Sequence, residues 1–508
     1  MITAGFVSVL NPFCLGLILA GVVIGIIFGA LPGLTATMGV ALCLPLTFSM
    51  TPIQGLSLLV GLYIGGISGG LISAILLKIP GTPSSIATTF DGGPMAEKGE
   101  AGRALSIGVF YSFLGTMFSI AALLFIAPML ARFTLRFGPY EYFAIGIFSL
   151  TMVGSLVSGS VVKGLASCVL GLSLAMIGAA PVSGALRYTF GFHELDNGFE
   201  LLPVLVGLFA VSEILQAAEE GIEQKQSIIT KYKISLTGVT FKEFTEQFWN
   251  FTRSSLIGIG IGILPGIGGG TSNLIAYATA RNSSKYPEKF GTGVIDGVIA
   301  SETANNAGVG GALIPLMTLG IPGDAVTAML LGGLMLHGIS PGPMLFKTNG
   351  TLVYGIFAAV IIATILMYIV ELAGMRIFVR VLMVPRYILL PVIMILCCVG
   401  TYGANNRIFD VATVLVFGII GFLLLRFGFS LSPVILGFIL ERVIETNLIR
   451  GLMFSKGSFL PFLTSPIAAV FLCVTLLSII LTVRKELRMQ RAKATGSDTV
   501  VAGGVSLN

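Results

Sequence analysis

Four short segments interrupt apolar stretches of the sequence with Pro, Gly and small polar residues. The first half of the chain contains residues 32–37 (PGLTAT) and 80–85 (PGTPSS), and the second half contains residues 265–273 (PGIGGGTSN) and 322–324 (PGD). Pro and Gly release backbone groups from helical hydrogen bonds, so such breaks persist in a membrane where they are buried in protein or line an aqueous cavity. Interruptions at corresponding positions of two halves are typical of the substrate site of a transporter.

A new helix is expected to begin after each break. Its first N–H groups are unpaired and carry partial positive charge, which suits a carboxylate, and Ser or Thr hydroxyls add further donors there. The simpler alternative is a set of proline kinks with capped helix ends. We interpret the segments as a cradle for an anionic substrate, with candidate binding residues Pro32, Gly33, Thr35, Thr37, Gly81, Thr82, Ser84, Ser85, Gly266, Gly268, Gly269, Thr271, Ser272, Asn273 and Gly323.

Acidic residues form a separate signal in the second half. Between residues 292 and 344 the charged residues are Asp296, Glu302 and Asp324, with no Lys or Arg. Intramembrane acids are costly and usually functional, and amide oxygens beside them suit a hard cation such as Na⁺. We predict that Glu302, Asn305, Asn306 and Asp324 bind a coupling cation, Na⁺ or H⁺. Alternatively, Asp296 and Glu302 lie near a membrane face or cap helices. Lys78 is either a paired structural charge or a substrate contact.

The composition indicates that membrane-spanning helices position these candidate residues. The chain has 508 residues, of which 55% are hydrophobic and 10% charged, whereas about a quarter of the residues of soluble domains are charged. A membrane helix needs about 20 predominantly apolar residues. Apolar runs recur at residues 13–31, 55–77, 104–130, 351–370, 411–425 and 468–483. We therefore predict an all-α polytopic membrane protein with about 10–12 transmembrane helices, the broken segments forming helical hairpins.

The breaks belong to an internal repeat. Residues 25–33 (GIIFGALPG) match residues 258–266 (GIGIGILPG) at a shift of 233, and residues 68–81 match 310–323 at a shift of 242. Arg281, Lys285 and Lys289 follow the first break of the second half, whereas the corresponding loop of the first half is uncharged. Positive residues favour the cytoplasm, so we predict that the two repeats are inverted relative to each other.

The predicted organisation is a first membrane repeat (1–212), a cytoplasmic amphipathic connector (213–253), a second membrane repeat (254–483) and a basic tail (484–508). The positive charge of the tail indicates a cytoplasmic C-terminus. The N-terminus lacks the basic region of a cleaved signal peptide.

Other classes of protein are less well supported. The sequence contains no GxxxxGK[ST] or HExxH motif, and its six Cys and two His lack metal spacing. We therefore predict no enzyme activity, no cofactor, no metal beyond a transported Na⁺ and no nucleic-acid partner. An intramembrane aspartyl protease is an alternative because GIPGD at 320–324 loosely resembles a GxGD motif, but that chemistry needs two aspartates in one site. A passive anion channel is a further alternative.

The broken segments resemble those of the TctA-type large membrane subunit of the tripartite tricarboxylate transporter family. The resemblance is carried by GALPGLTATMGVALCLPLTF from residue 29, IPGTPSSIATTFDGGPMAEKGEAGRAL from 79, GILPGIGGGTSN from 262, SETANNAG from 301 and GIPGDAVTAMLLGGLMLHGISPGP from 320. It implies a bacterial inner-membrane protein that works with a small four-helix membrane subunit (TctB-like) and a periplasmic solute-binding protein (TctC-like). It further implies symport of small carboxylates, citrate among them, with Na⁺ or H⁺.

Overall fold

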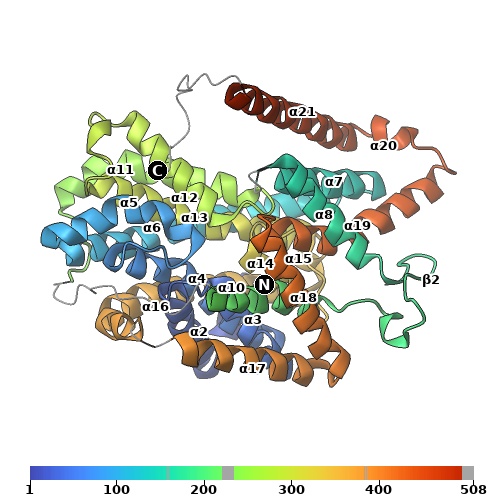
Figure 1. Cartoon of the computed structure of the whole chain (residues 1–508), viewed down its shortest axis with the longest axis horizontal. Helices are drawn as coiled ribbons and strands as arrows, with labels where there is room; N and C mark the ends of the chain where they lie inside the picture. Colours follow the sequence, from blue (N-terminus) through green and yellow to red (C-terminus); the bar gives the residue numbers. More distant parts are fainter. Residues whose placement is uncertain (157–159, 220–233, 383, 385, 495–508) are drawn as a thin grey trace.

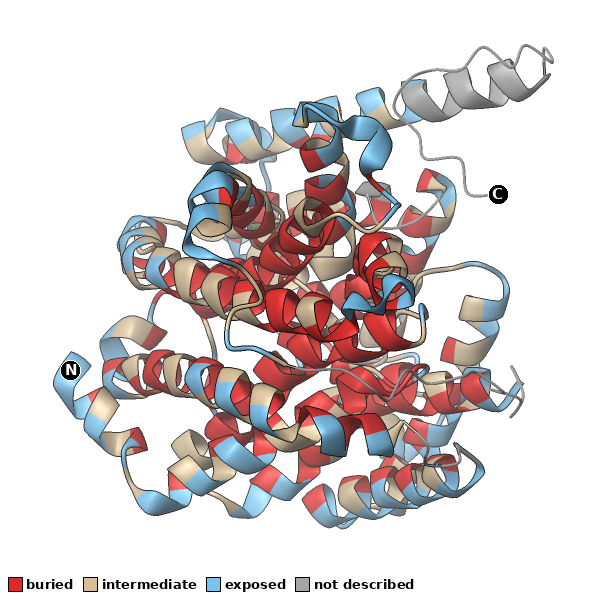
Figure 2. Ribbon diagram, turned by 90° about the vertical axis from the view of Figure 1, so that its left-hand side faces the viewer, coloured by how far each residue is buried: buried red, intermediate tan, exposed pale blue. Residues whose placement is uncertain are grey.

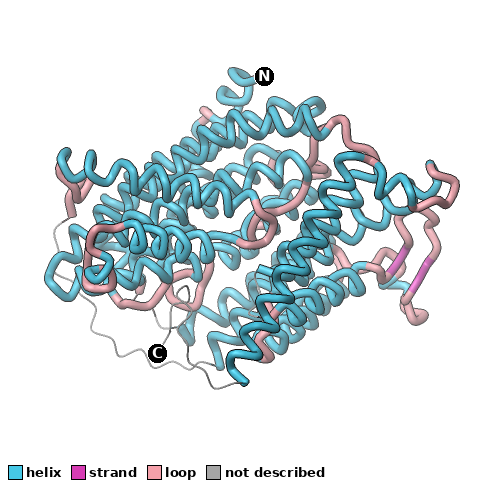
Figure 3. Tube along the Cα trace, turned by 90° about the horizontal axis from the view of Figure 1, so that it is seen from above, coloured by secondary structure: helices cyan, strands magenta, loops and turns pink. Residues whose placement is uncertain are grey.

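The computed structural model describes residues 1–156, 160–219, 234–382, 384 and 386–494. Figure 3 shows a molecule built almost entirely of helices. In the described part, the β-structure is one short antiparallel pair, β1 (Gly178–Ala179) with β2 (Leu186–Arg187), in a loop at one end of the molecule. The predicted all-α class is confirmed.

The first half begins with long helices separated by short ones. In chain order these are α1 (Ile2–Val9), α2 (Pro12–Ala30), α3 (Ala36–Cys43), η1 (Pro45–Ser49), α4 (Pro52–Leu76), η2 (Pro83–Ser85), α5 (Ile86–Met95), η3 (Ala96–Glu100), α6 (Ala101–Thr134), α7 (Pro139–Leu156) and α8 (Val161–Ala175). After the β-pair come η4 (His193–Leu195), α9 (Leu201–Leu205), η5 (Val206–Val211) and α10 (Ser212–Glu219).

The second half follows residues that the structure does not describe. It contains α11 (Phe241–Ile263), α12 (Gly268–Ser283), η6 (Pro287–Lys289), α13 (Ile295–Leu319), α14 (Ala325–Leu336), α15 (Leu345–Thr348), α16 (Gly350–Val381), α17 (Arg386–Asn405), α18 (Ile408–Arg426), α19 (Leu431–Phe454), α20 (Leu460–Thr464) and α21 (Pro466–Ala494).

Eight helical segments of the described chain are long and apolar enough to cross a membrane. They are residues 12–30, 52–76, 83–134, 201–219, 350–381, 387–405, 408–426 and 466–484. The six apolar runs of the sequence fall in these segments to within one residue. Eight is fewer than the predicted 10–12, because α3 and α14 are short and α13 carries Glu302, Asn305 and Asn306 among its apolar residues.

The interior is formed by helices from both halves, and buried residues gather at the centre of the molecule (Figure 2). α4 is almost wholly buried, and α13 is buried along most of its length. By contrast, α21 lies at the periphery (Figure 1), with an exposed apolar surface. Polar groups that position a substrate are therefore expected on α4, α13 and the short helices packed against them.

The two halves build the same helix packing. A Cβ atom on Gly29 of α2 would lie 2.2 Å from the carbonyl oxygen of Gly66 on α4. Gly262 of α11 has the same relation to Gly308 of α13, at 2.5 Å. These pairs are related by the shifts of 233 and 242 residues found in the sequence. Only glycine permits backbones this close, which explains the recurrence of Gly at these positions.

The predicted connector is not uniform in the structure. Its first residues belong to α10, which packs against α17 and α18, and its last residues form the start of α11. There Thr240 and Glu243 make a capping box, with Glu243 accepting from the Thr240 backbone N–H at 2.8 Å. Trp249 is exposed on α11. Residues 220–233 of the connector and 495–508 of the basic tail lie outside the described residues.

Candidate functional site

A cavity of about 490 Å³ lies where the helices that follow the four breaks begin. It is lined by the N-terminal ends of η2, α3, α12 and α14, together with parts of α4, α10 and the α18–α19 connection. Elements from both halves of the sequence therefore share one site.

Thr35 starts α3. Its backbone is extended, and its hydroxyl oxygen accepts from the Met38 N–H at 3.2 Å, as an N-cap residue does. The same hydroxyl donates to Oε2 of Glu213, on α10, at 2.7 Å. The first break thus ends in a capped helix whose cap is bonded to a carboxylate of the protein.

Thr82 is the N-cap residue of η2, the helix that follows the second break of the first half. Its backbone N–H donates to Oγ of Ser85 at 3.3 Å, and the hydroxyls of Thr82 and Ser84 lie 3.0 Å apart. The short helix η2 leads directly into α5. This end offers hydroxyl groups to the cavity and has no acidic cap.

α12 begins within a run of glycines. Ile267 is its N-cap residue, and no side chain caps this end. A Cβ atom on Gly269 would lie 3.0 Å from Cβ of Ser84, and one on Gly270 would lie 3.1 Å from the carbonyl oxygen of Pro83. The ends of η2 and α12 therefore touch, and the missing side chains leave the N–H groups of α12 accessible from the cavity.

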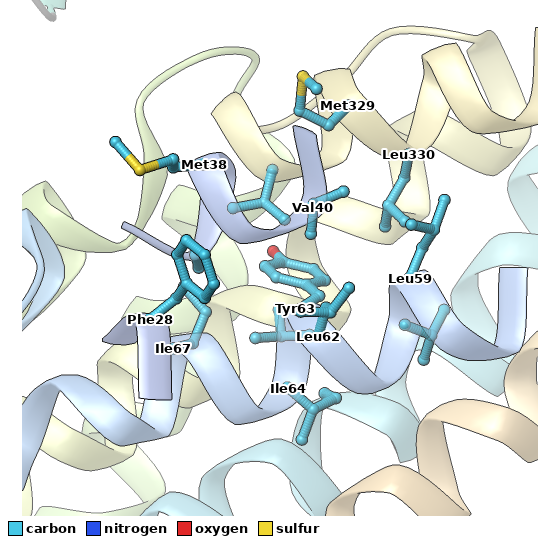
Figure 4. Packing of buried hydrophobic residues seen from close by; sticks show 14 of the residues in the cluster. Phe28, Met38, Val40, Leu59, Leu62, Tyr63, Ile64, Ile67, Met329 and Leu330 are labelled. Atoms are coloured by element: carbon cyan, nitrogen blue, oxygen red, sulfur yellow. The ribbon is translucent and has the colours of Figure 1, made fainter. Parts of the chain in front are cut away.

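α14 begins at Asp324, which acts as its N-cap. Asp324 Oδ1 accepts from the Thr327 N–H at 2.7 Å, and Oδ2 accepts from the hydroxyl of Tyr63 at 2.6 Å. Tyr63 lies on α4 beside Val40 and Leu62 (Figure 4). A tyrosine of the first half therefore holds the acid of the second half in place.

The cavity contains nine of the residues predicted from the breaks, namely Thr35, Thr37, Thr82, Ser84, Gly266, Gly268, Gly269, Thr271 and Asp324. Of these, Asp324 was predicted to bind the cation and the others the substrate.

The other predicted substrate residues, Pro32, Gly33, Gly81, Ser85, Ser272, Asn273 and Gly323, are not among the lining residues. Three of them pack against or bond to the backbone of residues around the cavity. Gly81 and Gly323 pack against the backbones of Gly29 and Gly262, and Asn273 donates to the Ser84 carbonyl at 2.5 Å.

The charge in the cavity is unexpected for an anion site. Among the described residues that line it, the ionisable side chains are Glu213 and Asp324, and none is Lys, Arg or His. The donors are thus hydroxyls, the Gln216 amide and backbone N–H groups at helix ends, which can bind an anion without a formal positive charge.

The four predicted cation residues occupy two places. Glu302 and Asn306 point toward α5 and α6. There Glu302 accepts from Thr88 at 2.5 Å and from Ser112 at 3.1 Å, and Asn306 donates to the Ser112 hydroxyl at 2.9 Å. This cluster, which we call the Glu302 cluster, comprises Thr88, Ser112, Glu302 and Asn306. Glu302 has no Lys, Arg or His partner among the described residues.

Asn305 lies apart from the Glu302 cluster, near the cavity. A Cβ atom on Gly269 would lie 2.6 Å from Asn305 Oδ1. Asn305 is 1% exposed, and within the described part of the chain its Oδ1 has no hydrogen-bond partner. Asp324 is engaged as a helix cap. A single site that contains all four predicted cation residues is therefore not what the structure presents.

Three polar residues of this region were missed by sequence reasoning. Glu213 was assigned to the connector because it follows an apolar run and precedes a polar one. Tyr63 is the counterpart of Asn305 at the shift of 242, so the repeat register could have identified it. Glu371, fully buried on α16, accepts from Ser68 at 2.6 Å and had no motif to mark it.

Lys78 and Asp296 have peripheral roles. Lys78 is exposed, pairs with Glu97 and does not line the cavity, which supports the structural reading of this charge. Asp296 lies in the first turn of α13. Among the described residues, neither Asp296 nor Asp410 is a hydrogen-bond partner of Asp324, so the structure does not pair Asp324 with either candidate.

The whole chain is similar to known proteins. The model of a family described as "Tripartite tricarboxylate transporter TctA family" matches residues 15–436. An Agrobacterium vitis relative described as "Uncharacterized 52.8 kDa protein in TAR-I ttuC' 3'region" is 36% identical over 492 residues, which cover 97% of each chain. A second relative from the same organism, "Uncharacterized protein in TAR-II ttuC' 3'region", is 38% identical over 231 residues, 46% of this chain and 96% of the relative. No solved structure matches.

Proposed function

Because the chain belongs to the tripartite tricarboxylate transporter TctA family, we propose that it is the large membrane subunit of a binding-protein-dependent secondary transporter that imports small carboxylates with a cation. The family is one of membrane transporters and not of enzymes. The proposed partners are a small TctB-like membrane subunit and a periplasmic TctC-like solute-binding protein. The proposed location is the bacterial inner membrane, with the C-terminus in the cytoplasm.

The convergence of four helix ends on one cavity carries this proposal. Two ends come from each half, and their donors are backbone N–H groups and hydroxyls. Such ends stabilise an anion by partial charges that are fixed in the protein. A lysine or arginine would bind a carboxylate more tightly, but release on the other side of the membrane would then cost more. Helix ends suit a substrate that must both bind and leave.

The coupling cation is proposed to bind at the Glu302 cluster. A buried carboxylate without a cationic partner is costly when ionised, and a bound Na⁺ or H⁺ would remove that cost. Glu302, Thr88 and Ser112 supply oxygen atoms, and oxygen ligands suit hard cations. Asn305 Oδ1 and Asp324, near the cavity, offer further oxygens for a cation that accompanies the substrate.

The two halves are proposed to be inverted repeats that alternate access to the cavity. The unequal charge of their corresponding loops, uncharged in the first half and positive in the second, supports this arrangement. The equivalent packing of Gly29 and Gly262 supports a common plan for the two halves. The 10–12 spans predicted from the sequence require that some of the shorter or more polar helices also cross the membrane.

Uptake by proteoliposomes tests the proposal. The full chain is reconstituted with its small membrane subunit, the solute-binding protein is added outside, and uptake of radiolabelled citrate, succinate and propionate is measured. The uptake of each substrate is measured in three conditions: with an imposed Na⁺ gradient, with a pH gradient and without a gradient. Accumulation above the external concentration, with one gradient only, is the expected result. Equilibration without a gradient would indicate a passive channel, and no uptake of any carboxylate would contradict the substrate class.

A further inference from the structure

Two of the four helix ends at the cavity are already occupied by carboxylates of the protein. Asp324 caps its own helix, α14. Glu213 comes from α10 and bonds to Thr35, the cap of α3. The ends of η2 and α12 have no acidic cap among the described residues. The four ends are therefore not equivalent for an incoming anion.

Glu213 reaches the cavity through an unusual helix. α9, η5 and α10 form one continuous helical segment, in which η5 is a π-helix with i→i+5 hydrogen bonds. Such turns change the direction of the side chains that follow and occur frequently at functional sites. Phe209, Glu213 and Gln216 line the cavity from this segment. The segment therefore places the Glu213 carboxylate at the cavity.

No basic residue neutralises Glu213 in the described part of the chain. The arginine that contacts α10 is Arg426, and it pairs with Glu219 at 3.6 Å. The hydroxyl proton of Thr35 is donated to Glu213 and is not available to a substrate. Like charges a few ångströms apart in a partly buried site repel each other strongly. An ionised Glu213 therefore opposes a substrate carboxylate at the end of α3.

We propose that Glu213 is a specificity-determining residue that limits how many carboxylates of a substrate the cavity accepts. One substrate carboxylate binds beside the contact between Ser84 and the N-terminal end of α12, at the hydroxyls of Thr82 and Ser84 and the N–H groups of α12. Glu213 keeps the end of α3 closed to a second carboxylate. This inference rests on the proposed carboxylate substrate. It goes beyond it by assigning discrimination between anions of different charge to one residue.

Direct binding tests the inference without the solute-binding protein, which has a selectivity of its own. Calorimetry on the full chain in lipid nanodiscs gives the Kd of citrate, succinate and propionate, at a pH at which all three are fully ionised. Glu213→Gln keeps an acceptor for Thr35 and removes the charge. We expect it to tighten citrate binding at least about tenfold, which is about 1.4 kcal/mol, and to change propionate binding less than about twofold.

Three further variants separate charge from structure. Glu213→Asp keeps the charge and should retain the discrimination of the wild type. Thr35→Val removes the hydroxyl but not the charge and should also retain it. Glu219→Gln changes an acid of the same helix that does not line the cavity, and should match the wild type for all three anions.

Several results would overturn the role of Glu213. One is an unchanged ratio of citrate to propionate affinity in Glu213→Gln, and another is an equal change for all three anions. A loss of discrimination in Glu213→Asp or Thr35→Val would also exclude charge as its cause. If the wild type binds citrate, these results leave the proposed function intact. If the wild type binds none of the three anions, the proposed substrate class is wrong, and the role of Glu213 falls with it.

Discussion

The hydroxyl of Tyr63 donates a 2.6 Å hydrogen bond to Oδ2 of Asp324, and this bond joins the two halves of the protein at the edge of the cavity. Tyr63 is buried on α4, and Asp324 is the first residue of the α14 helix end. The bond therefore connects α4 of the first half to the cavity-facing end of α14 in the second half. A movement of α14 relative to α4 would break this bond.

Replacement of Tyr63 by Phe removes this bond and leaves one carboxylate oxygen of Asp324 without its donor. Loss of a hydrogen bond to a charged group costs about 1.5–3 kcal/mol. We expect a lower midpoint of thermal unfolding and reduced carboxylate uptake. Tyr387→Phe changes an exposed tyrosine and serves as the control. Equal unfolding midpoints in Tyr63→Phe and the control would show that the bond contributes nothing to stability.

Replacement of Glu302 by Gln removes the charge of the Glu302 cluster and keeps a side chain of nearly the same shape. If the cluster binds the coupling cation, gradient-driven uptake should fall at least about tenfold while the folded protein remains in the membrane. The cation dependence should weaken in parallel. Uptake is measured at increasing Na⁺ and at several pH values. A Na⁺ and pH dependence identical to that of the wild type would remove Glu302 from the coupling role.

Replacement of Gly269 by Ala places a methyl group 2.6 Å from Asn305 Oδ1 and 3.0 Å from Ser84 Cβ, at the contact between the ends of η2 and α12. We expect uptake to fall strongly, because the new group displaces the side chains of Asn305 and Ser84. Gly260→Ala, on α11, meets nothing within 4 Å and should transport normally. Uptake and protein yield are compared for the two variants. Normal uptake by Gly269→Ala would contradict the cradle formed by these helix ends.

Replacement of Gly29 by Ala tests the packing of α2 against α4, since the new Cβ would lie 2.2 Å from the Gly66 carbonyl oxygen. Overpacking of this kind costs about 1–3 kcal/mol or more. We expect a lower unfolding midpoint and a smaller monodisperse fraction in size-exclusion chromatography. Gly16→Ala lies on the same helix, where nothing is within 4 Å, and should behave like the wild type. Indistinguishable variants would mean that α2 and α4 separate at little cost.

Cysteine labelling tests the inversion of the repeats. In a variant without the six native cysteines, single cysteines replace Ser49 and Lys285, which are both exposed. An impermeant maleimide added to intact cells should label position 49 and not position 285, because the positive loop is predicted to be cytoplasmic. Permeabilised cells provide the control for reactivity. Labelling of both positions from the same side would refute the inversion.

Much of the fold could be predicted from the sequence. The apolar runs locate the long helices because a helix in lipid must be apolar over about 20 residues. Pro and Gly locate the breaks because they remove helical hydrogen bonds. The recurrence of GxxxG around Gly29 and Gly262 predicted two related halves, and the structure places both glycines in equivalent contacts. The sequence predicted α13 least well, because polar residues interrupt its apolar pattern and no long apolar run marks the helix.

The sequence by itself determined the helices, the four breaks and the residue types at each new helix end. Only the tertiary structure decided which side chains meet. Thr88 and Glu302 are 214 residues apart, as Tyr63 and Asp324 are 261 apart. Periodicity puts Glu302 and Asn306 on one helix face and Asn305 on another, but it cannot say which helix each face meets. No sequence pattern identified Glu213, because its place in the cavity depends on how η5 packs against α3 and carries α10 to Thr35.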